Sequence, residues 1–365
     1  MPFYRIRALP RQPQRAEDRR DMHLTPPTPT DDAVISAIDP AEADGAASRL
    51  AFLEFSDLYL EPNGAAWYKT APDDNVRNTL EGPYLEDVQY LREQLLKHVG
   101  SVDFLMDIQG VRLRVQCIST VDGDVYVCRR AAKTPMPVER LGYPAELIKS
   151  LLSDAFTGGG LILFTGATGS GKSTSLASIL AARLKLFGGV AWTAENPVET
   201  LLHGTHGSGV CYQTEVPRDE DFGMAIQRML RGAPNIIVIG EIRSAKAAAQ
   251  AVLAGTSGHL VLSTLHANDI QSALHRLKSM LVHEGLDGAF LGDAMGAVLH
   301  QSMSYARAPD RNRRVVTVSP LIVAGSRNAT AIRAHMRGGE FHQLSSEIER
   351  QKRVLLIPGQ AGGML

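Results

Sequence analysis

Hydrophobic and polar positions follow two different patterns along this chain. In the first part, hydrophobic residues alternate with polar ones, which is typical of strands buried on one face. A short helix is expected to end at Phe55 and to precede these strands. The expected strands are residues 56–60, a stretch that ends at Thr70, and residues 102–108, 111–117 and 125–130. One apolar stripe at helical spacing lies between them and comprises Val88, Leu91, Leu95, Leu96 and Val99. This part is therefore predicted to be a small α+β domain.

In the second part, short apolar runs alternate with helical segments. The apolar runs cover residues 161–165, 190–194, 236–239 and 260–264. Continuous apolar strands separated by helices are typical of a parallel sheet with helices on both faces. From about Leu281 onward the pattern is mainly helical, with one candidate strand at residues 315–318.

Composition marks the boundaries between these parts. Residues 1–44 are rich in Pro, Arg, Asp and Thr and hold few large apolar side chains, so we expect a mostly disordered tail. The N-terminal domain then covers residues 45–132. Residues 133–140 contain two prolines and mixed charges, as linkers often do, and the second domain covers residues 141–365.

Charge and cysteine content narrow the class of protein. The net charge is -1 over 365 residues, whereas proteins that bind nucleic-acid backbones usually carry a strong basic surplus. The three cysteines form no CxxC pair, so they indicate neither a disulfide framework nor a zinc site. No apolar stretch approaches the length of a bilayer span. We therefore expect a soluble protein of a reducing cytosol, with at most peripheral membrane contact.

A glycine-rich segment carries the clearest chemical signal. Residues 166–174 read GATGSGKST and lie directly after an apolar run and before a helical stretch. In this context glycines let backbone N–H groups turn inward onto phosphate oxygens, and the following helix contributes its positive end. The predicted nucleotide-binding residues are Gly166, Ala167, Thr168, Gly169, Ser170, Gly171, Lys172, Ser173 and Thr174. Lys172 would reach the β and γ phosphates of ATP, and Ser173 would bind Mg²⁺.

Other candidate residues follow the later strands. Glu199 lies shortly after strand 190–194, where a carboxylate can orient a water for attack on the γ phosphate; otherwise it is a solvated loop residue. Glu241 follows Gly240, at a strand end where many phosphate-loop enzymes have a metal-binding aspartate. Because glycine replaces that aspartate and only Glu241 remains, the contact between Glu241 and the metal would pass through water. His266 is a candidate sensor of the γ phosphate or a structural histidine, and His259 is a weaker candidate.

Four sequence blocks, GATGSGKST, AENPVE, IGEIR and TSGHLVLSTLHAND, occur in this order. Together they resemble the secretion and pilus traffic ATPases of type II secretion, type IV pili and type IV secretion. The likeness extends from about Ser56 to the C-terminus. It implies an α/β fold with a RecA-like P-loop ATPase domain and a parallel-rich sheet, preceded by a small α+β (PAS-like) N-terminal domain. It also implies that Glu199 is the catalytic base, that Glu241 belongs to the metal strand and that His266 belongs to a histidine box.

Several residues depart from the family's pattern. Asn196 and Ser244 stand where an aspartate is usual, and GAPN at residues 232–235 replaces a more acidic run. The tetracysteine zinc module of many extension and secretion ATPases is missing from this sequence. The missing zinc module moves the chain toward the pilus retraction ATPase and toward the DotB and TraJ type of type IVB secretion and conjugation.

Three arginines of the first domain are candidates for contacts between subunits. Arg112 and Arg114 are two residues apart on one predicted strand, so their side chains leave the same face. Exposed arginines usually form a solvated face. The resemblance, however, implies a ring hexamer in which Arg112, Arg114 and Arg129 approach the neighbour's nucleotide and offset charge on the γ phosphate.

The resemblance implies a cytoplasmic homohexamer, peripherally associated with the inner membrane, that hydrolyses ATP. Together with inner-membrane components it would power a type IV secretion or conjugative transfer machine. A pilus retraction ATPase, a DNA-translocating motor and a scaffold that binds nucleotide without hydrolysis are the alternatives. Near-neutral charge and the lack of interleaved aromatic and basic residues argue against the strand stacking of a DNA-translocating motor. We also expect no sequence-specific nucleic-acid partner.

Overall fold

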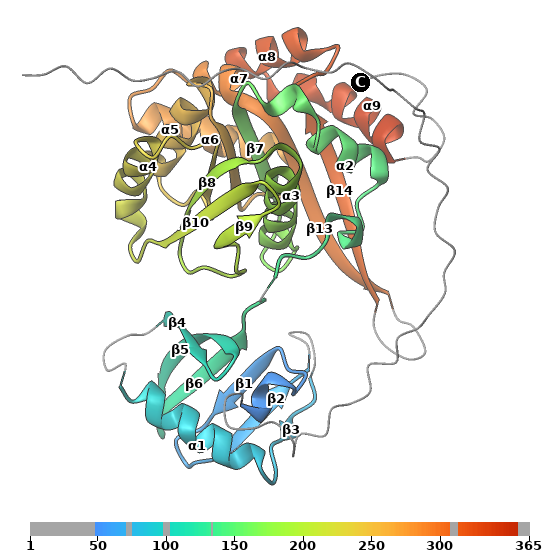
Figure 1. The fold of residues 1–365 in the computed structure, drawn as a ribbon. Coiled ribbons are helices and arrows are strands. Elements are labelled where there is room, and N and C mark those ends of the chain that lie inside the picture. Colours follow the sequence, from blue (N-terminus) through green and yellow to red (C-terminus); the bar gives the residue numbers. More distant parts are fainter. Residues whose placement is uncertain (1–47, 71–74, 98–102, 133, 307–312, 357–365) are drawn as a thin grey trace, which may run out of the picture. The chain divides into compact units, whose positions relative to one another are not determined.

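The chain forms two sheets with separate hydrophobic cores (Figure 1). The computed structural model describes residues 48–70, 75–97, 103–132, 134–306 and 313–356. The expected disordered tail lies outside these residues, as do Val99 and part of the expected linker.

The first sheet has six strands, all antiparallel, in the order β3-β2-β1-β6-β5-β4. Its strands are β1 (Asp57–Leu60), β2 (Ala66–Lys69), β3 (Asn78–Thr79), β4 (Asp103–Ile108), β5 (Val111–Thr120) and β6 (Gly123–Arg130). Helix α1 (Tyr84–Leu95) buries Val88, Leu91 and Leu95 in the same core as the alternate residues Leu58 and Leu113 of the sheet. The alternation read from the sequence therefore identified the buried face of this sheet.

Two details of this part differ from the prediction. The helix expected before Phe55 is a single 3-10 turn at Arg49–Ala51. Leu96 was expected in the apolar stripe of α1, but the helix ends at Leu95 and Leu96 is 64% exposed. The stripe thus stops one residue earlier than its spacing suggested.

The second sheet has eight strands in the order β14-β13-β7-β12-β11-β8-β10-β9. Its strands are β7 (Gly160–Thr165), β8 (Gly189–Glu195), β9 (Gly204–His206), β10 (Gly209–Glu215), β11 (Ile236–Ile239), β12 (Leu260–Leu265), β13 (Met295–Ala306) and β14 (Arg313–Ile322). The six strands from β13 to β10 in this order are parallel, and the two edge strands are antiparallel to their neighbours. Parallel strands need covered faces, and here helices supply the cover.

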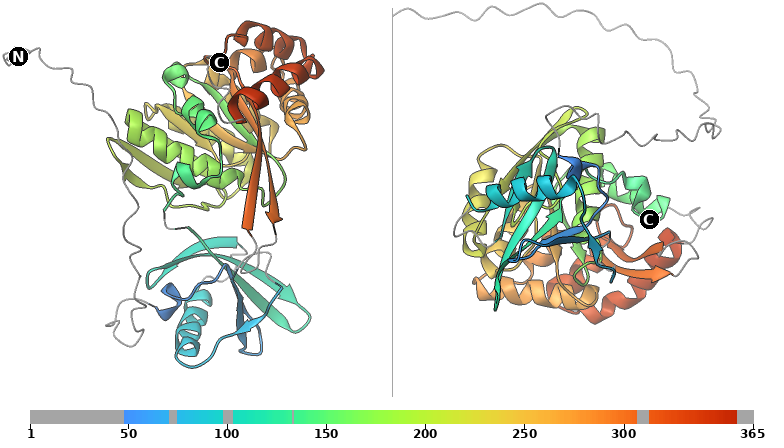
Figure 2. Two further views of the ribbon diagram at one scale, coloured as in Figure 1. Left: turned by 90° about the vertical axis from the view of Figure 1, so that its right-hand side faces the viewer. Right: turned by 90° about the horizontal axis from the view of Figure 1, so that it is seen from below.

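Helices cover both faces of the eight-stranded sheet (Figures 1 and 2). They are α2 (Ala145–Leu151), α3 (Lys172–Phe187), α4 (Phe222–Leu230), α5 (Ala245–Thr256), α6 (Ile270–His283), α7 (Phe290–Ala294), α8 (Ala329–Gly338) and α9 (Ser345–Leu356). On the central strand β7, Leu161 and Leu163 belong to the core shared with α4 to α8, whereas Ile162 and Phe164 belong to the core shared with α2 and α3. Both faces of β7 are therefore buried, which explains its continuous apolar sequence.

The C-terminal part corrects the sequence prediction. Helices α7, α8 and α9 lie here and the strand expected at 315–318 lies within β14, but β13 and β14 also form a long antiparallel hairpin, which Figure 2 shows in orange, extending beyond the shorter strands. Strand β13 also pairs in parallel with β7, so Val298 and Leu299 are buried on opposite faces. An apolar run buried on both faces cannot be distinguished from a buried helix by periodicity. Among the described residues, no helix combines the length and apolar character needed to cross a membrane.

Candidate nucleotide-binding site

The glycine-rich segment forms the predicted loop between a buried strand and a long helix. Strand β7 ends at Thr165 and α3 begins at Lys172. The ammonium group of Lys172 donates hydrogen bonds to the carbonyl oxygens of Gly166 at 3.1 Å and Ala167 at 2.8 Å. Burial lowers the pKa of Lys172, and the negative charges of Glu241 and Glu199 oppose this shift. The loop thus holds a buried cation at its own centre, next to the first turn of α3.

A cleft opens beside this loop at the carboxyl ends of the parallel strands. Its polar lining residues come from α3 and from the segments at the ends of β8, β11 and β12, and they include Ser173, Glu195, Asn196, Glu199, Glu241, Arg243 and Thr264. Ligands of open parallel sheets bind at this edge. The fold therefore gathers the residues that the sequence placed after separate strands.

The two glutamates after β8 occupy different environments. The Glu195 carboxylate accepts hydrogen bonds from Thr193 Oγ1 at 2.6 Å and from Gln213 Nε2 at 2.9 Å. Burial raises the pKa of Glu195. The side chain of Glu199 is 52% exposed and lines the same cleft as Ser173. Both carboxylates line the cleft, and Glu199 is therefore the more accessible of the two to water and ligand.

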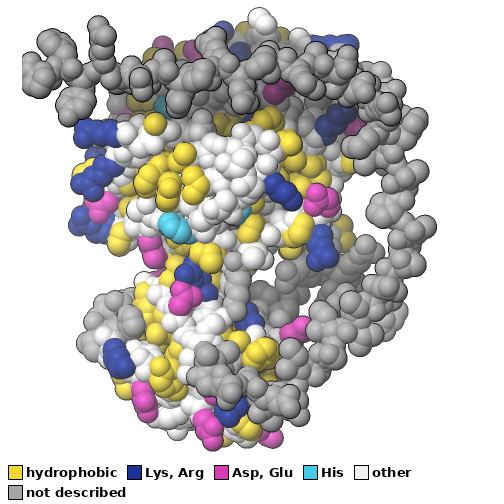
Figure 3. All heavy atoms as spheres, in the orientation of Figure 1, with side chains coloured by type: hydrophobic (Ala, Val, Ile, Leu, Met, Phe, Trp, Pro, Cys, Tyr) yellow, Lys and Arg dark blue, Asp and Glu magenta, His cyan; other side chains and the backbone are white. Residues whose placement is uncertain are grey.

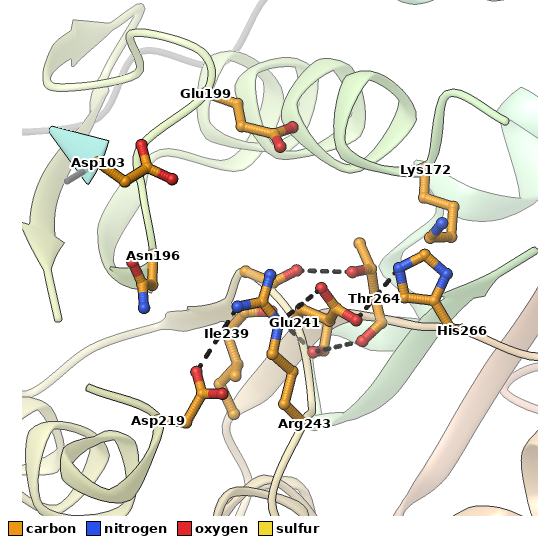
Figure 4. Close-up of polar contacts among 12 residues, drawn as sticks. Asp103, Lys172, Asn196, Glu199, Asp219, Ile239, Glu241, Arg243, Thr264 and His266 are labelled. Atoms are coloured by element: carbon orange, nitrogen blue, oxygen red, sulfur yellow. Dashed lines mark hydrogen bonds and ion pairs between the residues drawn. The ribbon is translucent and has the colours of Figure 1, made fainter. Parts of the chain in front are cut away.

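Glu241 lies at the centre of a polar chain at the end of β11 (Figure 4). One carboxylate oxygen is 2.9 Å from Arg243 Nε, and the other is 3.3 Å from His266 Nε2. Arg243 also lies 3.7 Å from a carboxylate oxygen of Asp219. Arg276 donates to the backbone carbonyl of His266 at 2.9 Å and so fixes the residue that carries the ring. The structure thus places His266 against Glu241.

Strand β12 fixes the end of β11 through two hydroxyl groups. Ser263 Oγ donates to the carbonyl of Ile239 and Thr264 Oγ1 donates to that of Gly240, both at 2.7 Å. Gly240 itself packs against Glu195, because a Cβ atom built on it would lie 3.3 Å from both Cα and Cγ of Glu195. This close approach gives a physical reason for glycine at a position where many phosphate-loop enzymes have aspartate.

Of the departures from the family's pattern, Asn196 has a structural explanation, and Ser244 has a role that aspartate could also fill. The side-chain amide of Asn196 donates to the carbonyl of Pro217 at 3.2 Å, a bond that an ionised aspartate could not make. Ser244 is the N-cap of α5, and its hydroxyl accepts a hydrogen bond from the backbone N–H of Ala247. An aspartate would satisfy this second role as well.

His259, the weaker histidine candidate, precedes β12 and therefore lies at the opposite edge of the sheet from the loop. Its Nδ1 is 3.0 Å from the carbonyl oxygen of Pro234. The structure thus separates the two histidines of the block by the length of a strand, and only His266 reaches the end that carries the cleft.

The three candidate arginines lie in the six-stranded sheet. Each forms an ion pair within that sheet: Arg112 with Asp107, Arg114 with Asp103, and Arg129 with Asp57. In the strand register Arg114 lies opposite Arg129, so all three side chains share one face. That face is the one opposite the core formed with α1. Their approach to a neighbour's nucleotide stays a prediction.

The donor set of the cleft fits a magnesium ion. Mg²⁺ prefers oxygen ligands and usually keeps several waters or substrate phosphates around it. The Ser173 hydroxyl and the carboxylates of Glu199 and Glu241 line one cleft. Across the described ranges, no three His, Cys, Asp or Glu side chains group into a metal-binding cluster. Phosphate and water oxygens would therefore have to complete the coordination of a cation here.

Sequence reasoning missed Gln301, which contacts the loop, and Tyr143, which contacts Gln301. Gln301 on β13 donates to the carbonyl of Ser170, and Tyr143 bonds to the same glutamine. No local pattern marks either residue, because Gln301 lies 131 positions from Ser170 in a segment predicted to be helical. Only the pairing of β13 with β7 brings it beside the loop.

The covered parallel sheet, the glycine-rich loop and the acidic cleft define a P-loop nucleotide-binding protein. Residues 92–339 match the family described as Type II/IV secretion system protein, and the chain belongs to this family. It is 32% identical over 250 residues to the type IV pilus ATPase PilU of Pseudomonas aeruginosa, a match that covers 68% of this chain and 63% of PilU. Across three curated relatives the chain spans 63%, 45% and 54% of their length.

Solved structures show the same fold. The pilus retraction motor PilT with bound ADP has a TM-score of 0.67 and 25% identity, covering 86% of this chain and 91% of PilT. The ATPase DotB of Legionella pneumophila has a TM-score of 0.62 and 22% identity, covering 82% of this chain and 84% of DotB. This likeness confirms the predicted fold class, a RecA-like domain with a parallel-rich sheet preceded by a small PAS-like α+β domain.

Proposed function

We propose that this protein is a homohexameric ATPase that powers a type IV secretion or conjugative transfer machine. It would act in the cytoplasm, in peripheral contact with inner-membrane components of that machine. Family membership supports the traffic-ATPase class, and the names of PilU and PilT describe an ATPase and a motor. The observation that carries the proposal is the single cleft in which Ser173, Glu199 and Glu241 meet beside the Lys172 loop.

The proposed chemistry divides among these side chains. Lys172, held by the loop carbonyls, would neutralise charge on the β and γ phosphates. Glu199 would orient a water for in-line attack on the γ phosphate and accept its proton. Bound Mg²⁺, held by Ser173 and through water by Glu241, would offset charge on the phosphate oxygens. His266 would sense the γ phosphate. Its Nε2 is 3.3 Å from a carboxylate oxygen of Glu241, so it would link Glu241 to the presence of that phosphate.

Substitutions in the cleft test hydrolysis directly. Glu199→Gln should lower the rate of phosphate release by about 100-fold or more, the range expected for loss of a general base, while ATP still binds. Lys172→Ala should abolish both binding and hydrolysis. Glu349→Gln, which removes an exposed carboxylate paired with Lys352 on α9, is the control and should leave the rate unchanged. Equal and negligible rates for wild type and Glu199→Gln would instead indicate a nucleotide-binding scaffold.

Pilus retraction is the second candidate, and the likeness to PilU and PilT favours it. The two machines differ in what fails when the motor stops. In the organism that encodes this chain, replacing Glu199 by Gln should reduce transfer of DNA or protein to recipient cells if the first proposal holds. Loss of pilus-dependent surface motility with normal transfer would instead assign the protein to a pilus.

A DNA-translocating motor is the remaining enzymatic alternative. Such proteins bind strands in a positively charged groove with stacking aromatic residues. On the face drawn in Figure 3, acidic side chains lie beside basic ones over the described surface. We therefore expect ATP hydrolysis to be independent of added DNA, and a severalfold stimulation by DNA would overturn this expectation.

A further inference from the structure

We propose that Gln301 is the positioning residue of the phosphate-binding loop, and that the Tyr143 hydroxyl ties this loop to the segment that leads into the ATPase sheet. This inference rests on the proposed nucleotide-binding function of the loop. Figure 1 shows β13, which carries Gln301, next to β7, the strand that leads into the loop.

The side-chain amide of Gln301 makes three hydrogen bonds at a buried position. Gln301 is 1% exposed. Its Nε2 donates to the carbonyl of Ser170 in the loop, and its Oε1 accepts from Ser175 Oγ at 2.9 Å in the first turn of α3. Oε1 also accepts from Tyr143 Oη at 2.5 Å. One side chain therefore holds both the loop and the helix that the loop opens.

The partners fix the orientation of this amide. The carbonyl of Ser170 can only accept a hydrogen bond, so the NH₂ group of Gln301 must face it. The amide oxygen then faces Ser175 and Tyr143, whose hydroxyls act as donors. A glutamate would present an oxygen to the Ser170 carbonyl, and a methionine would make none of the three bonds. The position therefore requires a side chain with a donor and an acceptor at glutamine's length.

Two loop glycines are in direct contact with the same residue. Gly166 has a φ of 145°, and a Cβ atom on it would lie 2.1 Å from the backbone oxygen of Gln301. Gly171 has a φ of 88°, and its Cβ would lie 2.7 Å from Gln301 Nε2. Both ends of the loop thus pack on Gln301 without space for a side chain. Displacement of this part of β13 would have to move the loop.

Tyr143 gives the loop a second connection along the chain. It lies between the 3-10 turn Val138–Arg140 and α2, in the segment that follows β6, the last strand of the six-stranded sheet. The side chain is 6% exposed, so its hydroxyl needs an internal partner, and Gln301 supplies it. A change in the position of this segment would therefore reach the phosphate-binding loop through one hydrogen-bonded side chain.

A second buried glutamine provides a matched control. Gln351 on α9 is 0% exposed and bonds to the backbone of Ile322 on β14 through both ends of its amide. None of its hydrogen bonds goes to the loop. Gln351→Met and Gln301→Met therefore remove comparable buried bonds, and only the second removes support from the loop.

The test combines amide hydrogen exchange with nucleotide binding in the full chain. Without nucleotide, exchange over residues 166–175 should be about tenfold faster in Gln301→Met and severalfold faster in Tyr143→Phe, and unchanged in Gln351→Met. The dissociation constant of fluorescent ADP should rise about tenfold in Gln301→Met, the factor for the one buried hydrogen bond that Gln301 makes to the loop itself, and less than twofold in Gln351→Met.

Each outcome bears on the inference separately from the ATPase proposal. Equal loop exchange and equal ADP affinity in Gln301→Met and Gln351→Met would reduce Gln301 to a core residue and overturn the inference. If Gln301→Met does not fold, Tyr143→Phe decides, because it removes one oxygen only; unchanged loop exchange would then refute the tie. If Lys172→Ala leaves ADP binding intact, the nucleotide site itself is wrong, whatever the exchange data show.

Discussion

At the scale of single residues, Gly240 shows how a missing aspartate can be compatible with the candidate site. The residue packs against Glu195, whose carboxylate is already engaged by Thr193 and Gln213. A second carboxylate at position 240 would lie among the acidic residues of the cleft. Like charges at short range disfavour ionisation of both groups. Glycine avoids this conflict and leaves Glu241 as the acidic residue at the end of β11.

Two substitutions at Gly240 should therefore separate the effect of side-chain size on stability from the effect of charge. Gly240→Ala requires only a shift of a few tenths of an ångström around Glu195, and it should lower the free energy of unfolding by less than about 1 kcal/mol. Gly240→Asp should lower it by roughly 1–3 kcal/mol, because a carboxylate is buried without a compensating partner. Thermal unfolding measures both. Equal losses for Ala and Asp would show that crowding, not charge, determines the residue at this position.

Glu195 should make stability depend on pH. Burial raises its pKa in the folded protein above its ordinary value of 4.5, so the folded state binds this proton more tightly than the unfolded chain. The contribution of Glu195 to stability is therefore greatest below pH 4.5 and decreases as pH rises through the folded pKa. Glu195→Gln keeps an acceptor for Thr193 and Gln213 and removes the titration. Relative to wild type, the variant should become progressively more stable above pH 4.5 and then level off.

Urea unfolding midpoints measured at intervals from pH 4 to pH 8 check this expectation. The difference between the midpoints of Glu195→Gln and wild type should grow across the lower part of the range. Parallel curves for the two proteins would mean that Glu195 ionises in the folded state as readily as in the unfolded chain.

At the scale of elements, helix α5 begins directly after the site and depends on its cap. The hydroxyl of Ser244 accepts a hydrogen bond from the backbone N–H of Ala247. The preceding residues Glu241 and Arg243 belong to the polar chain of the cleft. Ser244→Ala should lower the free energy of unfolding by about 1 kcal/mol, as loss of an N-cap usually does. Ser244→Asp should stay close to wild type, because aspartate caps as well as serine. Urea unfolding compares the three proteins, and similar losses for Ala and Asp would rule out the capping explanation.

The hairpin β13–β14 is the element that the sequence predicted least well. Its residues are buried on both faces or lie in a register set by β7, so neither period 2 nor period 3.6 dominates. By contrast, β7, β8, β11 and β12 were predicted with boundaries within one residue, because each is a short apolar run bounded by turns or helices. The error concerned the strand that carries Gln301, the proposed positioning residue of the loop.

At the scale of the whole molecule, the three arginines of the six-stranded sheet should separate into two roles. Asp57 is 1% exposed, and Arg129 supplies its ion pair at 2.7 Å. Arg129→Ala should lower the free energy of unfolding by roughly 1–3 kcal/mol, because it leaves a buried carboxylate with less compensation. The side chain of Asp107 is 62% exposed, so Arg112→Ala should cost less than about 0.5 kcal/mol. Equal losses in chemical unfolding would contradict this distinction.

The proposed role of Arg112 and Arg114 at a neighbour's nucleotide should be visible only when subunits assemble. In the proposed ring, Arg112→Ala and Arg114→Ala should lower the ATPase rate at least tenfold, because each removes a guanidinium proposed to offset γ-phosphate charge. Unfolding of the monomer should be unaffected. Unchanged turnover in a ring of normal size would exclude a contribution from these residues to the neighbour's site.

The sequence by itself determined the parts whose chemistry is local. The loop at 166–174 follows from contiguous residues between a strand and a helix, and Glu199, Glu241 and His266 follow from the rule that parallel strands end at one edge. Only the tertiary structure decided which distant side chains meet. Tyr143 and Gln301 are 158 positions apart, and the contact between Gly240 and Glu195 depends on β8 lying beside β11. Such contacts are set by strand order and register, which one sequence read by its local periodicity does not specify.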